Sequence, residues 1–297
     1  MNSIKSRHNF LVALAFLGPA LFFYLMYFII PIPMSFFYSL FKWNGITPDM
    51  EFIGLKNWNS LFADSVFWKS VLNNFVLVIM SIIIQIPFGI ILGAMVSSKM
   101  KGSKIFKFFY FIPMTLSAVA IGLIWIFIYE PNFGVVNAFL EIIGLGQFTT
   151  GWLGDPSTAL GAVILTVCWQ YIPFYMIIFS AAISSIPVEL SEAAYIDGAT
   201  RIQTFFRITL PLISGTIKMA CVLALTGSLK YFGLIYVMTE GGPSHATELM
   251  ATYMYKQAFT NFRMGYGSTV ASFMFILSIG LTLLTLSIGK KKVDTYA

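Results

Sequence analysis

Charged side chains gather in one short stretch between two long apolar segments, Ser191–Ile213. The stretch carries two carboxylates and two guanidinium groups, which belong to Glu192, Asp197, Arg201 and Arg207. A polar stretch between two segments long enough to cross a bilayer must be a loop at a membrane surface. The chemistry open to these side chains is ion pairing and hydrogen bonding with another macromolecule, so the loop is a candidate docking site.

The first part of this loop predicts a short helix. Pro187 suits the first position of a helix, and Glu189 would lie near the positive end of the helix dipole. A narrow stripe of small or flat apolar side chains follows at helical spacing, formed by Leu190, Ala193, Ala194 and Ile196.

A turn and a second short helix are predicted next. Gly198 tolerates a positive φ and can end the first helix. Residues from Arg201 to Leu210 then form the second helix, which Pro211 closes. Because a helix–turn–helix of this size cannot bury a core of its own, we expect it to fill a groove on another protein.

The composition places the loop in a membrane protein. Of 297 residues, 58% are hydrophobic and 10% are charged, whereas about 25% are charged in an ordinary soluble domain. The mean hydropathy is +0.83. We expect Cys168 and Cys221 to be free and reduced, because both fall in apolar segments. The net charge of +6 bears on membrane orientation and does not indicate binding to nucleic acid.

Six stretches are long enough for a spanning helix, which needs about 20 mostly apolar residues. They run from about Phe10 to Ile30, Val71 to Val96, Phe108 to Tyr129, Ala159 to Ser184, Ile217 to Met238 and Gly267 to Ile288. Pro31 and Pro33 are expected to end the first stretch. Kinks are expected in the second, third and fourth stretches, at Pro87, Pro113 and Pro173.

A cleaved signal peptide is the competing interpretation of the first stretch, because Lys5 and Arg7 precede it. Its apolar run is longer than the roughly 7–15 residues of a signal core, and no small-residue cleavage site follows. An uncleaved span is therefore favoured.

The distribution of Lys and Arg predicts the orientation. With the N-terminus in the cytoplasm, the inner segments hold twelve such residues and the outer loops hold five. The inner ones are Lys5, Arg7, Lys99, Lys101, Lys104, Lys107, Arg201, Arg207, Lys218 and Lys290 to Lys292. The positive-inside rule then makes both termini and the Ser191–Ile213 loop cytoplasmic. Acidic residues, Glu248 among them, fall in the outer loops.

Motifs for catalysis are missing from the sequence. No G-x-x-x-x-G-K-[ST] loop occurs, so the chain lacks that kind of site for ATP hydrolysis. No G-x-S-x-G elbow occurs, and His8 and His245 lack metal-ligand spacing. We therefore expect neither an enzyme nor a chain with its own metal or cofactor.

The charged loop resembles the EAA loop of permeases from binding-protein-dependent ABC importers. The matching pattern is Glu192-Ala193-Ala194, Gly198, Ile208 and Leu210-Pro211, with the family's spacing throughout. Other stretches are similar to the carbohydrate, maltose-permease-like branch: Phe52-Ile53-Gly54-Leu55 with Asn57-Trp58, and Thr239-Glu240-Gly241-Gly242-Pro243 with Tyr255 and Ala258-Phe259. The resemblance covers nearly the whole chain.

The resemblance implies a set of partners in a bacterial cell membrane. A second, homologous permease would complete the pathway, and an extracytoplasmic binding protein would deliver sugar. A dimer of ATPase subunits would bind ATP and Mg and hydrolyse the ATP, and the loop would dock in a cleft of one of them. The residues that the resemblance assigns to this coupling are Glu192, Ala193, Ala194, Asp197, Gly198, Arg201, Ile208, Leu210 and Pro211.

Lys230 is the one charged side chain deep in a predicted span. If Gly241 marks the outer surface, eleven residues of helix place Lys230 about 16 Å below it, near the midplane. An ammonium there costs at least about 2.5 kcal/mol, so it must face a cavity or a partner. Three interpretations stay open: hydrogen bonding to sugar hydroxyls, neutralisation of an acidic sugar, or pairing with a carboxylate or helix C-terminus of the second permease.

Polar and aromatic residues near Lys230 are candidates for a substrate pathway. They are Gln170, Tyr171, Tyr175, Ser228 and Tyr231. Tyrosine rings suit the C–H faces of sugars, and amides suit their hydroxyls. Ordinary interhelical hydrogen bonding uses the same residue types, and this alternative stays open.

Together these patterns predict an all-α polytopic membrane protein with six transmembrane helices, a cytoplasmic helix–turn–helix coupling loop and both termini in the cytoplasm. The expected divisions are 1–70 for the first span and outer loop, 71–290 for the permease core and 291–297 for a tail. The expected function is translocation of a sugar or oligosaccharide in an ABC importer. The alternatives are an ABC permease for a non-sugar or acidic solute, a stand-alone secondary transporter and an intramembrane enzyme.

Overall fold

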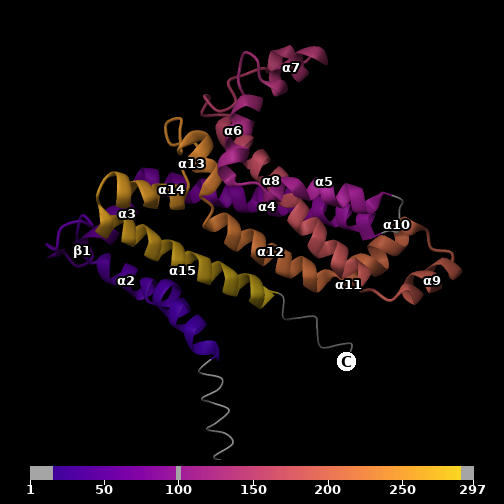
Figure 1. Cartoon of the computed structure of the whole chain (residues 1–297), viewed down its shortest axis with the longest axis horizontal. Helices are drawn as coiled ribbons and strands as arrows, with labels where there is room; N and C mark the ends of the chain where they lie inside the picture. Colours follow the sequence, from indigo (N-terminus) through magenta and orange to yellow (C-terminus); the bar gives the residue numbers. More distant parts are fainter. Residues whose placement is uncertain (1–15, 98–101, 289–297) are drawn as a thin grey trace, which may run out of the picture. The chain divides into compact units, whose positions relative to one another are not determined.

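The computed structural model describes residues 16–97 and 102–288. These residues form two compact, mostly helical units (Figure 1). The first contains the described residues up to Asp64 together with Met254–Ile276, and the second contains Ser65–Tyr253 and continues from Leu277. The expected tail 291–297, residues 10–15 of the first expected span, and Lys5, Arg7, Lys99, Lys101 and Lys290 to Lys292 lie outside the described residues.

The first unit begins with one helical run, Phe16–Tyr38. The expectation that Pro31 and Pro33 end this helix was wrong. A π-helical turn, Leu25–Ile29, precedes α2 (Pro31–Tyr38) and places Pro31 in the first turn of a new α-helical segment. Proline is tolerated there because the missing N–H has no partner to lose.

A small hairpin follows in the first unit, so the expectation of a purely α-helical chain was incomplete. Strands β1 (Phe41–Lys42) and β2 (Glu51–Phe52) pair antiparallel, and α3 (Lys56–Ala63) follows them. The Asn57 amide nitrogen donates to the carbonyl oxygens of Ser39 and Phe41, each across 2.9 Å, and so ties α3 to the hairpin. The unit also contains the π turn Lys256–Thr260 and the first part of α15 (Met264–Ile288).

The second unit is built on two long helices, α4 (Ser65–Ser97) and α8 (Ala159–Ser184). Both remain helical through their prolines. Glycines four residues apart on α4 allow the two backbones to approach closely. A Cβ on Gly89 would lie 2.6 Å from Tyr175 Cβ, and one on Gly93 would lie 2.9 Å from Phe179 Cβ.

The third expected span is broken into α5 (Ser103–Thr115) and α6 (Ala118–Ile128), which are bent by 98°. The helix continues through Pro113 and ends two residues later, at Thr115. Ser117 adopts an extended conformation and its hydroxyl accepts a hydrogen bond from the Ala120 N–H at 3.2 Å, which starts the second helix. A short helix, α7 (Val135–Ile142), and a 3-10 turn (Gly146–Phe148) connect α6 to α8.

The fifth expected span is broken at Lys230. Helix α12 (Ser214–Leu229) ends there, and α13 (Gly233–Thr239) starts after a short irregular segment. Helix α14 (Met250–Tyr255) follows. The predicted depth of Lys230 assumed one continuous helix up to Gly241, and this assumption was wrong.

Four helices among the described residues are long and apolar enough to cross a membrane. They are Phe16–Tyr38, Ser65–Ser97, Ala159–Ser184 and Met264–Ser287. The number rises to six if each of two bent helix pairs counts as one span. One pair, α5 with α6, coincides with the third expected span. The other joins Arg201–Leu212 to α12, whereas the fifth expected span was Ile217 to Met238, so the count of six does not reproduce the expected spans.

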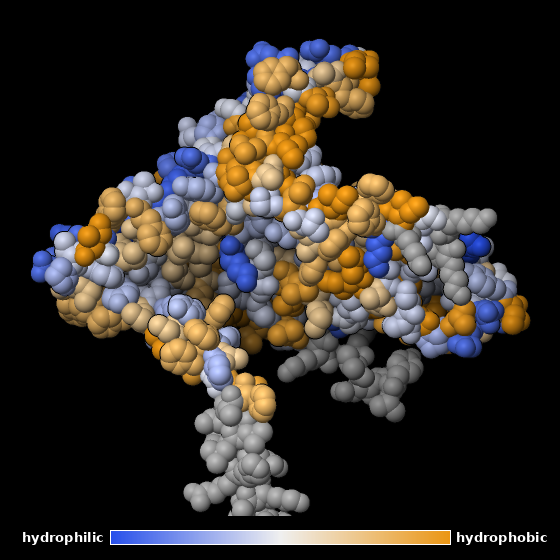
Figure 2. Space-filling model, in the orientation of Figure 1, coloured by the Kyte–Doolittle hydropathy of each residue, from blue (hydrophilic) through white to orange (hydrophobic). Residues whose placement is uncertain are grey.

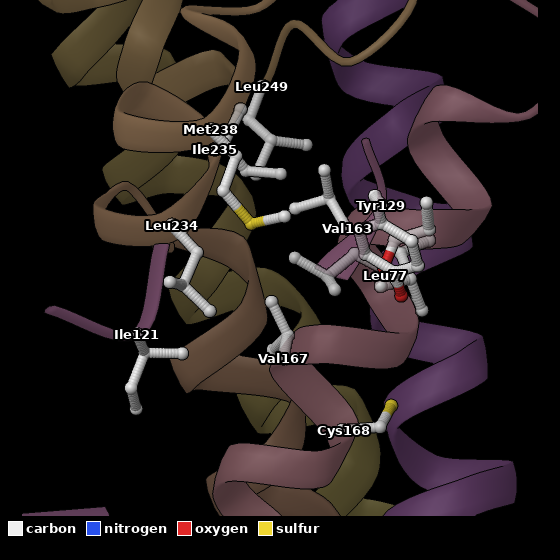
Figure 3. Close-up of a cluster of buried hydrophobic side chains, with 12 residues drawn as sticks. Leu77, Ile121, Tyr129, Val163, Val167, Cys168, Leu234, Ile235, Met238 and Leu249 are labelled. Atoms are coloured by element: carbon white, nitrogen blue, oxygen red, sulfur yellow. Dashed lines mark hydrogen bonds between the residues drawn. The ribbon is translucent and has the colours of Figure 1, made fainter. Parts of the chain in front are cut away.

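A buried cluster joins α4, α8 and α13 (Figure 3). Val163 and Val167 of α8 pack with Leu234 and Ile235 of α13, and Leu77 of α4 completes the contact. Outside this core, many apolar side chains are exposed, and Figure 2 shows them over α6. Exposed apolar helix surface of this kind is expected of a chain whose solvent is lipid.

Candidate coupling loop and transport cavity

The charged loop forms the expected first helix, α9 (Val188–Ile196). Pro187 is its N-cap rather than its first helical residue. Gly198 ends the turn with φ of +82°, as predicted. The Gly198 N–H donates to the Tyr195 carbonyl (3.1 Å) and the Ala199 N–H to the Ala194 carbonyl (2.9 Å), which is the pattern of a Schellman cap.

The second helical segment starts as expected but does not end where expected. A capping box opens α10 (Arg201–Thr204): the Thr200 hydroxyl accepts from the Gln203 N–H at 3.3 Å, and the Gln203 side chain accepts from the Thr200 N–H at 2.8 Å. A π turn (Phe205–Thr209) and α11 (Leu210–Leu212) continue it. The prediction that Pro211 closes the helix was wrong, because the π turn places Pro211 near the start of α11.

The residues predicted to act in coupling divide between an exposed surface and a packed side. Ala194 is buried and Ile208 and Leu210 are half-buried, whereas Glu192, Ala193, Asp197, Gly198, Arg201 and Pro211 are exposed. Two apolar side chains also stand out into solvent, since Ile196 is 86% exposed and Ile202 is 71% exposed. Within the residues that the structure describes, neither Glu192 nor Arg201 forms an ion pair. The loop is therefore a folded surface whose apolar and charged groups are left exposed by residues 16–97 and 102–288.

The packed side of the loop continues into a second buried cluster. Ile213, with Phe205 and Leu210 packed beside it, belongs to the same cluster as residues of three long helices. These are Ile86 and Ile90 of α4, Tyr175 and Phe179 of α8, and Ala220 and Ala224 of α12. The loop is thus anchored directly to the helices that surround the cavity described next, and Figure 1 shows it at one end of α4 and α8.

A cavity of about 530 Å³ lies where α12 ends at Lys230. Helices α4, α8 and α12 line it, together with Met114 and Ala118 near the break between α5 and α6. Five of the six predicted pathway residues line it: Lys230, Tyr231, Ser228, Tyr171 and Tyr175. Gln170 does not, and its buried Oε1 accepts no hydrogen bond among the described residues.

Several lining residues were missed by the sequence prediction, namely Ser81, Gln85, Phe174, Thr226 and Phe232. Ser81 and Gln85 lie four residues apart, so a shared helix face was available as a signal. The Gln85 amide nitrogen donates to Ser81 Oγ at 3.1 Å and to Cys168 Sγ at 3.6 Å, and Ser228 Oγ donates to Ser81 Oγ at 3.2 Å. On another wall, the rings of Tyr171 and Tyr231 meet edge to face, with centroids 6.1 Å apart.

The helix break beside the cavity is held by Asn74 of α4. Its amide nitrogen donates to the carbonyl oxygens of Ser228 (2.8 Å) and Leu229 (3.3 Å), the last two residues of α12. Its Oδ1 accepts from the Met250 N–H at 2.8 Å. One buried side chain therefore satisfies backbone groups at the end of α12 and the start of α14.

The neighbouring residue, Asn73, performs the same task for the loop before α14. Its amide nitrogen donates to the carbonyl oxygens of Ala246 (3.0 Å) and Glu248 (2.9 Å). Glu248, expected among the acidic residues of an outer loop, is fully buried, and its Oε2 lies 3.1 Å from His245 Nδ1. It is therefore not a surface group, and the family-like stretch Thr239–Pro243 begins at the last residue of α13.

Comparison with known proteins agrees with this architecture. Residues 85–291 match the family model described as the binding-protein-dependent transport system inner membrane component. A probable ABC transporter permease of Bacillus subtilis is 40% identical over 96% of this chain and 98% of its own. The multiple sugar-binding transport system permease protein MsmF of Streptococcus mutans is 32% identical over 90% of this chain and 91% of its own.

Solved structures extend the likeness to the whole fold. A chain of a bacterial ABC transporter for the import of the acidic polysaccharide alginate is 25% identical and superposes with a TM-score of 0.84, covering 97% of this chain and 98% of that one. The bacterial alginate transporter in complex with a periplasmic protein that carries an alginate pentasaccharide gives 25% identity and a TM-score of 0.83, over 96% of each chain. The chain therefore belongs to the inner membrane components of binding-protein-dependent transport systems, the permease subunits of ABC importers.

Proposed function

We propose that this permease translocates a sugar or oligosaccharide that an extracytoplasmic binding protein delivers to its outer face. A second, homologous permease completes the pathway in a bacterial cell membrane. A dimer of ATPase subunits binds ATP and Mg and supplies the free energy, because this sequence lacks a phosphate-binding loop of the Walker type. The loop Ser191–Ile213 faces the cytoplasm and docks on one ATPase subunit.

One observation carries the proposal: the exposed loop and the cavity share a single packed cluster. Ile213 packs in the same cluster as Tyr175 of α8 and Ala224 of α12, and both of the latter also line the cavity. A displacement of the loop by a closing ATPase would therefore reach the cavity wall through side chains already in contact. Close packing transmits such a displacement because protein interiors have low compressibility.

The choice of a sugar as solute is supported by the relatives and by the cavity's chemistry. Several relatives are named as sugar permeases, among them the Streptococcus mutans protein reported above. The cavity combines tyrosine rings with hydroxyl groups and one amide, in a volume of about 530 Å³. This volume is within the range of about 300–1,000 Å³ typical of small-molecule sites.

Reconstitution tests the proposal. The chain is purified with the proteins that accompany it, and the complex is placed in proteoliposomes with the binding protein outside. We expect uptake of a radiolabelled oligosaccharide that requires both ATP inside and the ATPase subunits. Uptake by the permease alone, driven by an ion gradient, would show a secondary transporter instead. Hydrolysis of a lipid or peptide by the purified chain would favour an intramembrane enzyme.

A further inference from the structure

The cavity at the end of α12 holds a cation and no carboxylate. Of the Lys, Arg, Asp and Glu residues that the structure describes, Lys230 alone lines the cavity. The other polar side chains of the lining provide hydroxyls and one amide, and they are Ser81, Gln85, Tyr171, Tyr175, Thr226, Ser228 and Tyr231. The cavity therefore offers hydrogen-bond donors and one full positive charge.

The described part of the chain does not use this charge. A lysine at the end of a helix often stabilises the terminal carbonyl groups. Here the side-chain amide of Asn74 already donates to the carbonyl oxygens of Ser228 and Leu229. Within the described part of the chain, Lys230 Nζ forms no ion pair or hydrogen bond, and the residue is exposed. The ammonium is therefore available to a group from outside this chain.

The missing carboxylate separates two kinds of solute. The hydroxyls of a neutral sugar both donate and accept hydrogen bonds. A protein carboxylate, which only accepts when ionised, is a strong partner for the sugar's O–H donors. None lines this cavity. An acidic sugar adds acceptor oxygens with a negative charge, and an ammonium with surrounding hydroxyl groups suits such an anion better than it suits a neutral polyol.

We infer that the cavity selects an acidic sugar, a saccharide that carries a carboxylate, and that Lys230 is the residue that determines this specificity. The carboxylate lies at Lys230 Nζ, and the C–H faces of the sugar ring lie against Tyr171 and Tyr231. This inference rests on the proposed function and narrows its substrate class. The competing source of negative charge is a carboxylate of the second permease, and the experiment below separates the two.

The test measures binding to the purified full complex of both permeases and the ATPase dimer, without the binding protein. The probes are a disaccharide that contains glucuronic acid and the neutral glucose disaccharide with the same linkage. The variants are Lys230→Gln and Lys230→Arg. Lys218→Gln is the matched control, because it removes one positive charge from the same helix about 18 Å away along the axis, and Lys218 does not line the cavity.

The wild-type complex is expected to bind the acidic disaccharide about tenfold or more tightly than the neutral one, as a charge-assisted hydrogen bond allows. Lys230→Gln should lose that preference and change affinity for the neutral disaccharide less than about twofold, while Lys230→Arg and Lys218→Gln keep the preference. Absence of any preference in the wild type, including absence of binding of both probes, would overturn the inference.

Copurification of the second permease separates the two sources of negative charge. If Lys230 pairs with the second permease, Lys230→Gln should lower recovery of the intact complex and weaken binding of both disaccharides to the same extent. This result would also overturn the inference. The wider proposal has its own readout, because ATP-dependent uptake of a neutral oligosaccharide by the wild type would sustain the importer function even where the acidic-sugar inference fails.

Discussion

The side-chain amide of Asn74 donates a hydrogen bond to the backbone carbonyl of Ser228 across 2.8 Å, at the last turn of α12. The contact joins two helices that are far apart in sequence, and Asn74 is fully buried. It also fixes the position at which the chain leaves the helix, just before Lys230. The location of the one charged group in the cavity thus depends on a neutral side chain of another helix.

Replacing Asn74 with alanine should destabilise this break. The change removes donors to Ser228 and Leu229 and the acceptor for the Met250 N–H. A buried backbone group left without its partner costs about 1–3 kcal/mol. We therefore expect a lower midpoint in a thermal unfolding scan of the purified complex, together with weaker solute binding in the cavity.

Asn73→Ala is the matched control for that substitution. Asn73 is also buried and donates two hydrogen bonds, but its acceptors are Ala246 and Glu248, away from the end of α12. We expect a similar loss of thermal stability with solute binding much closer to that of the wild type. Equal loss of binding in both variants would show that Asn74 has no particular role in positioning Lys230.

The contact between α4 and α8 should be intolerant of a side chain at Gly89. A Cβ there would lie 2.6 Å from Tyr175 Cβ and 3.2 Å from the Tyr175 backbone carbon. Gly89→Val must therefore separate the two helices, and overpacking of this kind costs about 1–3 kcal/mol. We expect less folded complex after detergent extraction, measured by size-exclusion chromatography.

Gly161→Val provides the comparison on α8. No atom lies within 4 Å of a Cβ built at Gly161, and its φ is not positive. We expect its yield of folded complex to stay near that of the wild type. A yield for Gly89→Val as high as for Gly161→Val would contradict the close helix contact.

Local sequence signals predicted the parts of the fold that depend on few neighbours. Ala159–Ser184 is helical as expected, and Gly198 forms the expected turn because a Schellman cap needs only its own segment and a residue that accepts positive φ. The break at Ser117 was not predicted, since the apolar run continues evenly on both sides of it. The predicted helix end at Pro211 was wrong because the π turn before it places Pro211 in the first turn of α11, where proline is tolerated.

The cavity lining was harder to predict than its location. Spans that are apolar all around do not indicate which side of the helix faces a cavity, because the hydrophobic pattern has no preferred face. Gln170 was predicted in the lining and Gln85 was not. The structure has Gln85 in the lining and Gln170 outside it, although both side chains are buried. The division into 1–70, 71–290 and 291–297 and the cytoplasmic orientation remain predictions.

The two glutamines give a direct test of which helix face lines the pathway. Gln85→Leu removes an amide that lines the cavity and donates to Ser81, so the half-saturation concentration for solute uptake should rise by about five- to tenfold, the equivalent of about one neutral hydrogen bond. Gln170→Leu replaces a buried oxygen that accepts no hydrogen bond among the described residues, so uptake should change little. The reverse order of effects would place Gln170, and not Gln85, in the pathway.

Coupling between ATP hydrolysis and transport should depend on the backbone of Gly198. Its φ of +82° is unfavourable for a side chain, although no atom would clash with a Cβ there. A leucine therefore adds about 1–2 kcal/mol of backbone strain, and relief of that strain would move the exposed end of α9. We expect Gly198→Leu to assemble in the membrane and hydrolyse ATP while uptake in proteoliposomes falls severalfold.

Two comparison variants separate backbone strain from bulk at Gly198. Gly198→Asn adds a side chain that tolerates left-handed backbone, so it should couple better than Gly198→Leu. Gly215→Leu places the same bulk at an exposed glycine of α12 whose φ is not positive, and it should transport normally. The ratio of solute transported to ATP hydrolysed decides between these cases, because loss of assembly lowers both quantities together. A wild-type ratio in Gly198→Leu would mean that coupling does not need this turn.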